Sequence, residues 1–203
     1  MNNKLDKNYK ITIITVTKNS ERHLEENILS VFNQTYKNYE HIIIDGDSED
    51  NTKNIIKKHI DKINYFISEP DKGLYYAMNK GIEKATGEII GILNSDDIYF
   101  PDALKIVNKY FVGDKNLDFL FGSVYKHKLL HGYNPKRIKW TFGFYTTHSV
   151  GFFIKKQAQK KVGFYDTQYK WSADYDFFYK MIVKFNLKGL ATKKNEIVGK
   201  FRR

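Results

Sequence analysis

Four polar residues that directly follow a short apolar run could bind a metal ion. A buried strand is predicted over residues 89–93, and the tetrapeptide Asn94–Asp97 follows it directly. In open α/β sheets, ligands bind at the carboxyl ends of the strands, and oxygen ligands there suit Mg²⁺ or Mn²⁺ holding a phosphate. Because Asn, Ser and Asp are also ordinary turn residues, a solvated turn is the alternative interpretation.

Two further acidic pairs occupy comparable places in the chain. Asp45 and Asp47 end a second predicted strand, and Asp174 and Asp176 stand at the start of a late helix. In a doubly wound sheet, carboxylates at strand ends converge on one cleft. The chain has no Gly-x-Gly-x-x-Gly and no Gly-Lys-Ser/Thr motif, so we expect a metal ion and basic side chains to hold any phosphate. This chemistry suits a reaction whose leaving group is a nucleoside diphosphate.

Alternating strands and helices are predicted to position these residues. Strands are expected at residues 10–16, 41–44, 63–68 and 89–93, and apolar residues at helical spacing predict a helix after each of them. We expect Ser20 to cap the first helix and Gly87 to occupy the C′ position after the third. This repeated pattern predicts an α/β fold with a mostly parallel central sheet flanked by helices.

The pattern weakens after residue 126. The region from 126 to 147 has no sustained period and is predicted to form a long loop or loose hairpin that covers a site. Both segments of the tail, 189–192 and 196–201, are expected to add edge strands. The other elements predicted in this half are a helix at 101–111, strands at 119–125 and 150–154, and helices at 156–161 and 175–185, the last starting at 172–174.

Length and composition limit the classes of protein to which the chain can belong. It has 203 residues, no cysteine and a net charge of +11, from 34 basic and 23 acidic residues. The length suits one domain, and the lack of cysteine excludes disulfides and fits the cytoplasm. Neither a transmembrane helix nor a signal peptide is predicted. The charge implies attraction to anions, but no nucleic-acid motif accompanies it, so we expect no nucleic-acid partner.

Several sequence blocks together resemble family 2 glycosyltransferases. They occur in the order typical of that family and span residues 10–180 or so. The resemblance implies a GT-A fold, a nucleotide-sugar donor, a divalent metal ion and inversion at the anomeric carbon. It also implies a single domain, with residues 1–98 as the nucleotide-binding half and 99–203 as the acceptor-side half. The blocks are Ile13–Asn19, Ser30–Tyr36, Asp45–Thr52, Glu69–Tyr75 with Ala77–Gly81, and Asn94–Asp97.

The resemblance also implies roles for individual residues. Asp96, with Asn94, occupies the Asp-x-Asp motif and would ligate Mn²⁺ or Mg²⁺. Asp45 matches the position that holds the nucleotide base. Asp174 matches the general base that takes the proton of the acceptor hydroxyl, although a helix N-cap is a plain structural role for it. The remaining donor contacts are expected from Thr15, Thr17, Asn19, Asn79, Ser95 and Asp97.

Some positions depart from the family pattern. Asn94 replaces the first Asp of Asp-x-Asp, which keeps an oxygen ligand but removes a charge. Gly46 replaces a second Asp, Ala173 stands where Glu often precedes the base, and Tyr76 stands where close relatives tend to have Asp. His148 resembles a histidine found near the acceptor or the diphosphate in this family, and a structural histidine is the alternative.

We therefore expect an inverting, metal-dependent transferase that moves a sugar from a UDP-sugar to a hydroxyl of a lipid-linked or cell-surface glycan, as in lipopolysaccharide synthesis. Its exposed lysines would hold it, in the cytoplasm, against the anionic inner face of the membrane. Three other interpretations stay open at this point. They are a metal-dependent nucleotidyltransferase or phosphohydrolase, a module that binds RNA or anionic lipid, and a degenerate glycosyltransferase that binds nucleotide without turnover.

Overall fold

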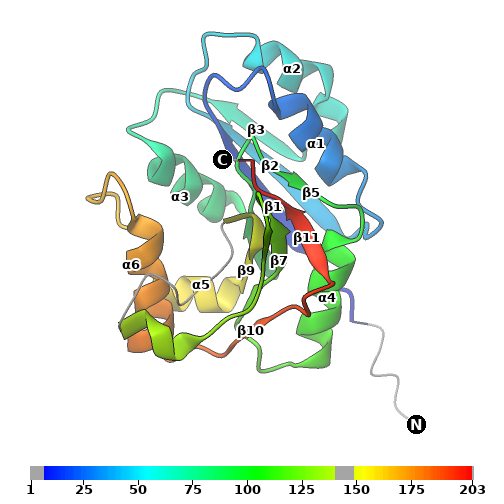
Figure 1. The fold of residues 1–203 in the computed structure, drawn as a ribbon. Helices are drawn as coiled ribbons and strands as arrows, with labels where there is room; N and C mark the ends of the chain where they lie inside the picture. Colours follow the sequence, from blue (N-terminus) through cyan, green and yellow to red (C-terminus); the bar gives the residue numbers. More distant parts are fainter. Residues whose placement is uncertain (1–6, 140–148, 203) are drawn as a thin grey trace.

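A seven-stranded sheet forms the centre of the molecule, which a computed structural model describes over residues 7–139 and 149–202 (Figure 1). Its strand order is β10-β6-β9-β4-β1-β2-β3. Strand β9 is antiparallel to both of its neighbours, and the other four pairs are parallel. The predicted mostly parallel sheet is therefore confirmed. The strands are β1 (Ile11–Thr17), β2 (Tyr39–Asp45), β3 (Tyr65–Ser68), β4 (Ile89–Ile92), β6 (Phe119–Phe121), β9 (Phe152–Lys155) and β10 (Gly189–Ala191).

Helices cover both faces of this sheet. One apolar cluster joins α3, α5 and α6 to one face, and two other clusters join α1, α2 and α4 to the opposite face. Short 3₁₀ turns occur at Ile60–Lys62, Pro135–Lys139 and Ser149–Gly151. The helices are α1 (Leu24–Phe32), α2 (Thr52–Lys58), α3 (Leu74–Lys84), α4 (Ala103–Gly113), α5 (Lys156–Val162) and α6 (Ala173–Tyr179), which continues as one π-helical turn at Lys180–Lys184.

A second, four-stranded sheet packs beside α4. It consists of β5 (Ile98–Tyr99), β11 (Ile197–Lys200), β7 (Ser123–Tyr125) and β8 (Leu129–Leu130), in that order. The prediction that 196–201 forms an edge strand is wrong, because β11 lies between β5 and β7. The strand predicted at 119–125 is divided between the two sheets at Gly122. A Cβ atom there would lie 2.5 Å from Val198 Cγ2, so the chain needs glycine where β11 crosses it.

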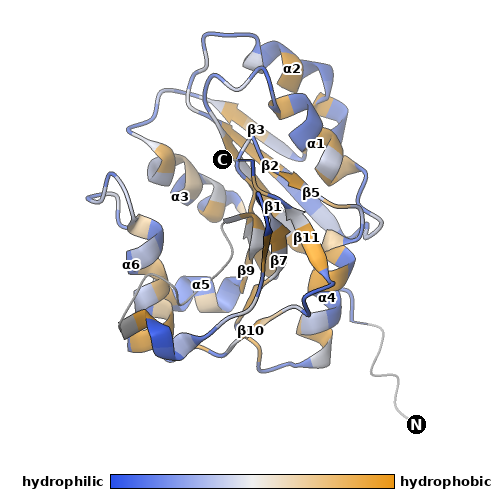
Figure 2. Cartoon of the chain, in the orientation of Figure 1, coloured by the Kyte–Doolittle hydropathy of each residue, from blue (hydrophilic) through white to orange (hydrophobic). Residues whose placement is uncertain are grey.

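The hydrophobic residues concentrate on the central strands (Figure 2). All seven residues of β1 are buried, as a β-branched strand covered on both faces requires. Because side chains alternate along a strand, Ile14 and Val16 join the cluster with α3 and α6, and Ile11 and Ile13 join the cluster with α4. Within residues 7–139 and 149–202, no helix has both the length and the apolar character needed to cross a membrane.

The predicted cap of α1 is wrong. His23, not Ser20, occupies the N-cap position. The Ser20 carbonyl instead accepts hydrogen bonds from the amides of His23 and Leu24, both at 3.1 Å, because a turn precedes the helix. The Ser20 hydroxyl lies 2.8 Å from the hydroxyl of Ser95, across the end of the sheet.

Gly87 does not cap α3, although the sequence predicts it. The C-cap residue is Ala85, and Gly87 has no positive φ. Glycine is needed there for a different reason. A Cβ atom at Gly87 would lie 2.7 Å from both the Lys10 carbonyl oxygen and the Thr12 amide nitrogen, so the turn before β4 can lie directly against β1 only without a side chain.

The N-cap role considered for Asp174 belongs to Ser172, which has a left-handed backbone conformation. Asp174 is the second residue of α6 and is half-buried. Of the region 126–147, predicted to be a long loop or loose hairpin, the structure describes residues 126–139. There β8 pairs antiparallel with β7, which lies just before the region, and the turn at Pro135–Lys139 follows.

Candidate functional site

The carboxyl ends of β1 and β4 meet at the switch point of the main sheet. These two strands are parallel neighbours, with β2 and β3 beyond β1 and β9 beyond β4. A cavity of about 670 Å³ opens where the chain leaves both strands. We call it the strand-end cavity. Its polar lining comes from three places: the end of β1 and the loop after it, the loop before α3, and the turn after β4. The residues include Thr17, Asn19 and Ser20, then Asp71, and then Asn94, Ser95 and Asp96.

Helix α1 fixes the turn that follows β4. The side-chain amide of Asn27 donates to the carbonyls of Asn94 at 2.9 Å and Asp97 at 2.8 Å. The amide of Asp97 closes the turn onto the Asn94 carbonyl at 2.9 Å. Asn27 is fully buried, so this turn is held from beneath and Asn94 and Asp96 face the cavity.

Two oxygen atoms of the lining have no hydrogen-bond partner among the described residues. They are Oγ1 of Thr17 and Oδ1 of Asn94, and both are buried. The amide nitrogen of Asn94 is already used, since it donates to Ser149 Oγ at 3.0 Å. Unpartnered buried oxygens are rare in folded proteins because they lose hydration without compensation. Here they leave an acceptor at the end of β1 and another after β4.

The two carboxylates after β4 have different environments. Asp96 is half-buried and lines the strand-end cavity. Asp97 is fully buried, and its Oδ1 accepts the backbone amide of Arg202 at 3.1 Å. Burial, together with the nearby Asp96 charge, raises the pKa of Asp97 to about 7. Asp96 can therefore reach a ligand, and Asp97 supports the turn from below.

A second cavity, of about 220 Å³, adjoins the first and shares Leu74, Asn94 and Phe201 with it. We call it the α6 cavity. Asp174 lines it, together with the phenol of Tyr75 and a largely apolar wall. The Tyr75 hydroxyl donates to Asp174 Oδ1 at 3.3 Å. The structure thus brings Asp96 and Asp174 to two cavities that meet at Asn94.

Three residues predicted to contact the donor have other partners in the structure. The Thr15 hydroxyl is buried 3.1 Å from Asn27 Oδ1 and 2.9 Å from His41 Nε2, because Thr15 points to the face covered by α1. The Asn79 amide is used at both ends, donating to the Tyr165 carbonyl at 2.9 Å and accepting its amide at 3.0 Å.

Asp45, the third of these residues, is fully buried at the end of β2. Its carboxylate accepts hydrogen bonds from the Ser48 amide at 3.0 Å, the Ser48 hydroxyl at 2.5 Å and the Ser68 hydroxyl at 2.6 Å. It therefore ties the loop after β2 to the end of β3. The structure does not bring Thr15, Asp45 or Asn79 to the lining of either cavity, and the same holds for Asp97, the fourth predicted donor contact outside the lining.

The other predicted site residues have varied positions. Asn19 and Ser95 line the strand-end cavity, with Asn19 tied to the neighbouring loop by its amide, 2.8 Å from Ser48 Oγ. Asp47 is exposed and pairs with Lys53 at 3.0 Å, and Asp176 pairs with Lys180 at 2.6 Å. His148 lies outside the described residues.

Sequence reasoning missed several residues of the strand-end cavity. Asp71 lies close to Gly46, where an added Cβ would be 2.7 Å from Asp71 Oδ2, so it fills the space of the second Asp expected there. The cations Lys18 and Arg22 and the imidazole of His23 line the same cavity. The turn-forming Pro-Asp-Lys-Gly sequence was a usable signal for Asp71, but nothing in the local sequence marks His23.

The oxygen atoms of the turn after β4 could bind a divalent metal ion. Among residues 7–139 and 149–202, no three His, Cys, Asp or Glu side chains gather as a metal cluster. Mg²⁺ and Mn²⁺ in phosphate sites need only one or two protein oxygens, because the substrate phosphates supply others. The Asp96 carboxylate and the unpartnered Asn94 Oδ1 meet that requirement. The residues present therefore fit a divalent ion that is bound together with a diphosphate.

Comparison with known proteins places the chain in a family. The model of glycosyl transferase family 2 matches residues 12–181, and the chain belongs to that family. It is 30% identical over 187 residues to an uncharacterized glycosyltransferase of Rickettsia typhi, a match that covers 85% of this chain and 58% of the relative. The chain thus spans less than two thirds of the length of that relative.

Two further similarities concern proteins with more specific names. The chain is 33% identical over 116 residues to WfgD of Escherichia coli, a UDP-Glc:alpha-D-GlcNAc-diphosphoundecaprenol beta-1,3-glucosyltransferase, covering 57% of this chain and 46% of WfgD. Residues 1–349 of Staphylococcus aureus TarS, solved in complex with UDP, superpose with a TM-score of 0.78 at 20% identity, covering 96% of this chain and 60% of that chain. The predicted GT-A fold is confirmed by this likeness.

A separate cavity of about 470 Å³ lies at the opposite edge of the sheet, next to the residues that precede β1 and β4. Among the described residues that line it, the one carboxylate is that of Glu88, which pairs with Lys7 at 3.2 Å. The ammonium groups of Lys155 and Lys156 are held by the backbone carbonyls of Lys115 at 2.6 Å and of Ala85 at 2.5 Å, which position the charges without neutralising them. This end of the molecule is strongly basic.

Proposed function

We propose that the chain is the catalytic domain of an inverting glycosyltransferase that uses a UDP-sugar, a divalent metal ion and a glycan acceptor. One observation carries the proposal. The strand-end cavity, with its unpartnered oxygens and Asp96, adjoins the α6 cavity, with Asp174, and Asn94 lines both. One cavity suits a charged nucleotide and the other suits the reacting hydroxyl of an acceptor.

The donor would occupy the strand-end cavity. Thr17 and Asn19 would contact the nucleotide from the loop after β1, and Ser95 would contact it from the loop after β4. Lys18 and Arg22 at the rim would offset the charge of the diphosphate. The UDP complex of TarS and the UDP-glucose named for WfgD support a uridine nucleotide.

Asp96 and Asn94 would hold Mn²⁺ or Mg²⁺. When bound, the ion would offset the negative charge that develops on the departing diphosphate. Asn94 contributes a neutral oxygen where the Asp-x-Asp motif has a carboxylate, so the site would depend more strongly on the phosphates of the donor. Asp97 would stay buried beneath the turn and support it without binding the ion.

Asp174 would act as the general base. The Tyr75 hydroxyl and the Tyr175 amide both donate to its Oδ1, at 3.3 Å and 2.9 Å. Within residues 7–139 and 149–202, Oδ2 is left to accept the proton of the attacking hydroxyl. The acceptor oxygen would bond to C1 of the sugar as the C1–oxygen bond to the diphosphate breaks on the opposite face, which inverts the anomeric carbon.

The acceptor would be a lipid-linked or cell-surface glycan, as the name of WfgD supports. We also propose that the protein acts in the cytoplasm and contacts the anionic face of the membrane, attracted by its net charge of +11. Residues 1–98 would form the donor half of the domain, and residues 99–203 would form the acceptor half. Flotation with phosphatidylglycerol vesicles tests the membrane contact, and binding that persists unchanged with neutral phosphatidylcholine vesicles would contradict an electrostatic attraction.

A thermal-shift panel tests the proposed function. The protein would be heated with UDP, GDP, CDP or dTDP, with and without Mn²⁺, beside Asp96→Ala and the exposed control Asp61→Ala. A ligand at about a hundred times its Kd stabilises the folded state by roughly 2.7 kcal/mol. We expect a Mn²⁺-dependent response to UDP that is retained in Asp61→Ala and lost in Asp96→Ala. No response to any nucleotide would contradict the proposal.

A further inference from the structure

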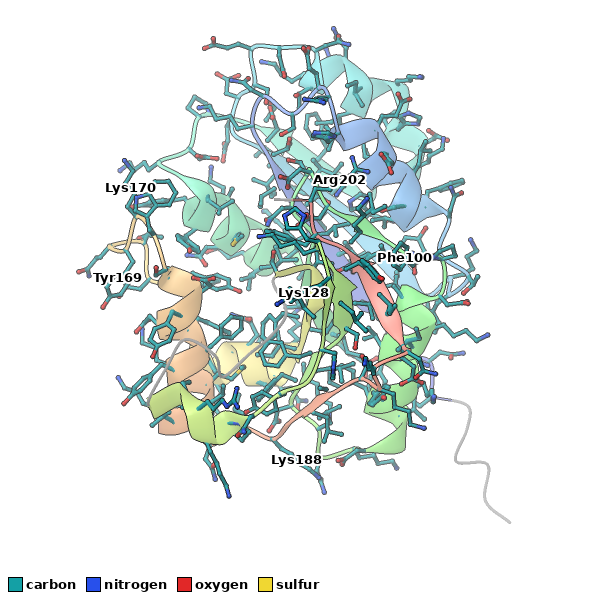
Figure 3. The ribbon with its side chains drawn as sticks, in the orientation of Figure 1. Phe100, Lys128, Tyr169, Lys170, Lys188 and Arg202 are labelled. Carbon is teal, nitrogen blue, oxygen red and sulfur yellow. The ribbon has the colours of Figure 1, made fainter. Side chains whose placement is uncertain are left out.

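The residues that follow β11 reach the strand-end cavity. Phe201 lines both cavities, and the amide of Arg202 donates to the buried Asp97 carboxylate. Figure 3 shows Arg202 beyond the end of β11, near the carboxyl ends of the central strands. A residue far along the chain therefore lies next to the turn that carries Asp96.

The Arg202 side chain turns toward the start of α1. Its Nη1 atom lies 3.0 Å from Nδ1 of His23, and its guanidinium pairs with Glu26. The contact with His23 joins residues 179 positions apart, and the Arg202 side chain is only 19% exposed. The ion pair offsets the charge of Glu26, which lies in the first turn of α1.

The chemistry of this contact indicates which tautomer His23 adopts. A guanidinium has five N–H donors and no acceptor. Nδ1 of His23 must therefore accept the hydrogen bond and cannot carry a proton. The single ring proton of the neutral imidazole is then on Nε2, which becomes a hydrogen-bond donor. His23 is one of the residues that line the strand-end cavity.

We propose that His23 donates a hydrogen bond from Nε2 to the diphosphate of the nucleotide donor, and that Arg202 acts as a positioning residue that keeps His23 in the tautomer able to do so. This inference rests on the proposed function, because it needs a nucleoside diphosphate in the strand-end cavity. Glu26 holds Arg202 in place, and the Arg202 amide anchors the same segment to Asp97. The donor site thus depends on the segment after β11.

Binding measurements on two ligands distinguish this role from a structural one. We would measure the affinities of UDP and uridine, with Mn²⁺, for the parent chain, His23→Phe, His23→Gln and Arg202→Gln. A hydrogen bond to a charged group corresponds to roughly tenfold to a hundredfold in affinity. We expect His23→Phe to weaken the binding of UDP by that factor and to leave the affinity for uridine unchanged. His23→Gln, which retains an N–H donor, should recover part of the loss.

Arg202→Gln should weaken the binding of UDP but not of uridine, and the effect should be smaller than that of His23→Phe. The control is His127→Phe, which changes an exposed histidine on the β7–β8 hairpin and should leave both affinities unchanged. Equal weakening of UDP and uridine in the His23 variants would overturn the inference, as would unchanged UDP binding. If the parent chain binds UDP no better than uridine, the proposed function itself fails, and the two failures are therefore distinguishable.

Nuclear magnetic resonance of the imidazole nitrogens tests the tautomer directly. Two-bond ¹H–¹⁵N correlations distinguish a ring with its proton on Nε2 from one with its proton on Nδ1. We expect the Nε2–H form for His23 in the parent chain and a mixture of both forms in Arg202→Gln. A proton on Nδ1 of His23 in the parent chain would overturn the inference, even if the variants bind UDP weakly.

Discussion

The hydroxyl of Tyr75, on α3, lies 3.3 Å from Oδ1 of Asp174, on α6, although the two residues are 99 positions apart. Leu74, next to Tyr75, is shared by the two cavities, and Asp174 lines only the α6 cavity. The hydrogen bond therefore orients the proposed base at the boundary between donor and acceptor. It also leaves the second carboxylate oxygen of Asp174 for the acceptor hydroxyl.

Tyr75→Phe tests this orientation. Loss of one hydrogen bond to a charged group should lower kcat by about tenfold, while the Kd of UDP stays as in the parent chain. Steady-state kinetics and isothermal titration calorimetry measure the two quantities. Tyr179→Phe, on the partly exposed end of α6, is the matched control and should leave kcat unchanged. A Tyr75 variant with full kcat would show that the contact has no role in catalysis.

Asn94→Asp tests the proposed metal ligands. The new carboxylate would place a second negative charge beside Asp96 and should bind a divalent ion more tightly. We expect the Mn²⁺ concentration for half-maximal UDP binding to fall by about tenfold or less, since ligand charge tunes such sites. Asn116→Asp, on an exposed loop, should not change it. Weaker Mn²⁺ dependence in Asn94→Asp would contradict the assignment of Asn94 Oδ1 as a ligand.

The burial of His41 should make the stability of the fold depend on pH. It is fully buried in β2, and burial lowers its pKa to about 3. Below the pKa of the unfolded chain, about 6.5, the unfolded state binds a proton that the folded state does not. This group therefore stabilises the fold fully above pH 6.5, and its contribution falls toward pH 3 by about 1.4 kcal/mol per pH unit.

Denaturant unfolding of the parent chain and of His41→Gln between pH 7 and pH 4 measures this contribution. The difference in the free energy of unfolding should shift in favour of the glutamine variant as the pH falls. The exposed His131→Gln should follow the parent chain at every pH. Parallel curves for the parent chain and His41→Gln would mean that His41 is protonated in the folded state.

Gly87→Ala tests the close approach of the turn before β4 to β1. The added methyl group would overlap backbone atoms of Lys10 and Thr12, so the free energy of unfolding should fall by about 1–3 kcal/mol. Gly113→Ala, at the end of α4, meets nothing within 4 Å and should change stability by less than about 1 kcal/mol. Equal effects of the two substitutions in urea unfolding would contradict the contact at Gly87.

Much of the main sheet could be predicted from sequence because its strands are short β-branched runs bounded by turn residues. β1 and β4 are such runs, and their ends correctly indicate where the polar loops gather. The position of β11 could not be predicted, because its pairing with β5 and β7 depends on residues far along the chain. The division of one apolar run between two sheets at Gly122 could not be predicted either, because it also depends on the distant strand β11.

The site residues divide in a similar way. Motif spacing singles out Asn94 and Asp96 after a strand end, and both line the strand-end cavity. It does not show on which face of a strand a side chain lies, and Thr15 points away from the cavity for that reason. Nor can spacing show that Asp45 is saturated by two serines or that Arg202 reaches His23, since these contacts exist only in the folded chain.

We infer that the strand-end cavity and the α6 cavity are the two halves of one transferase site. Calorimetric binding of UDP with Mn²⁺, measured beside sugar release from a UDP-sugar, tests it in Asp174→Asn and Asp96→Ala. We predict that Asp174→Asn binds UDP like the parent chain but turns over at least about a hundredfold more slowly, and that Asp96→Ala loses both properties. Parent-like turnover by Asp174→Asn would contradict the claim.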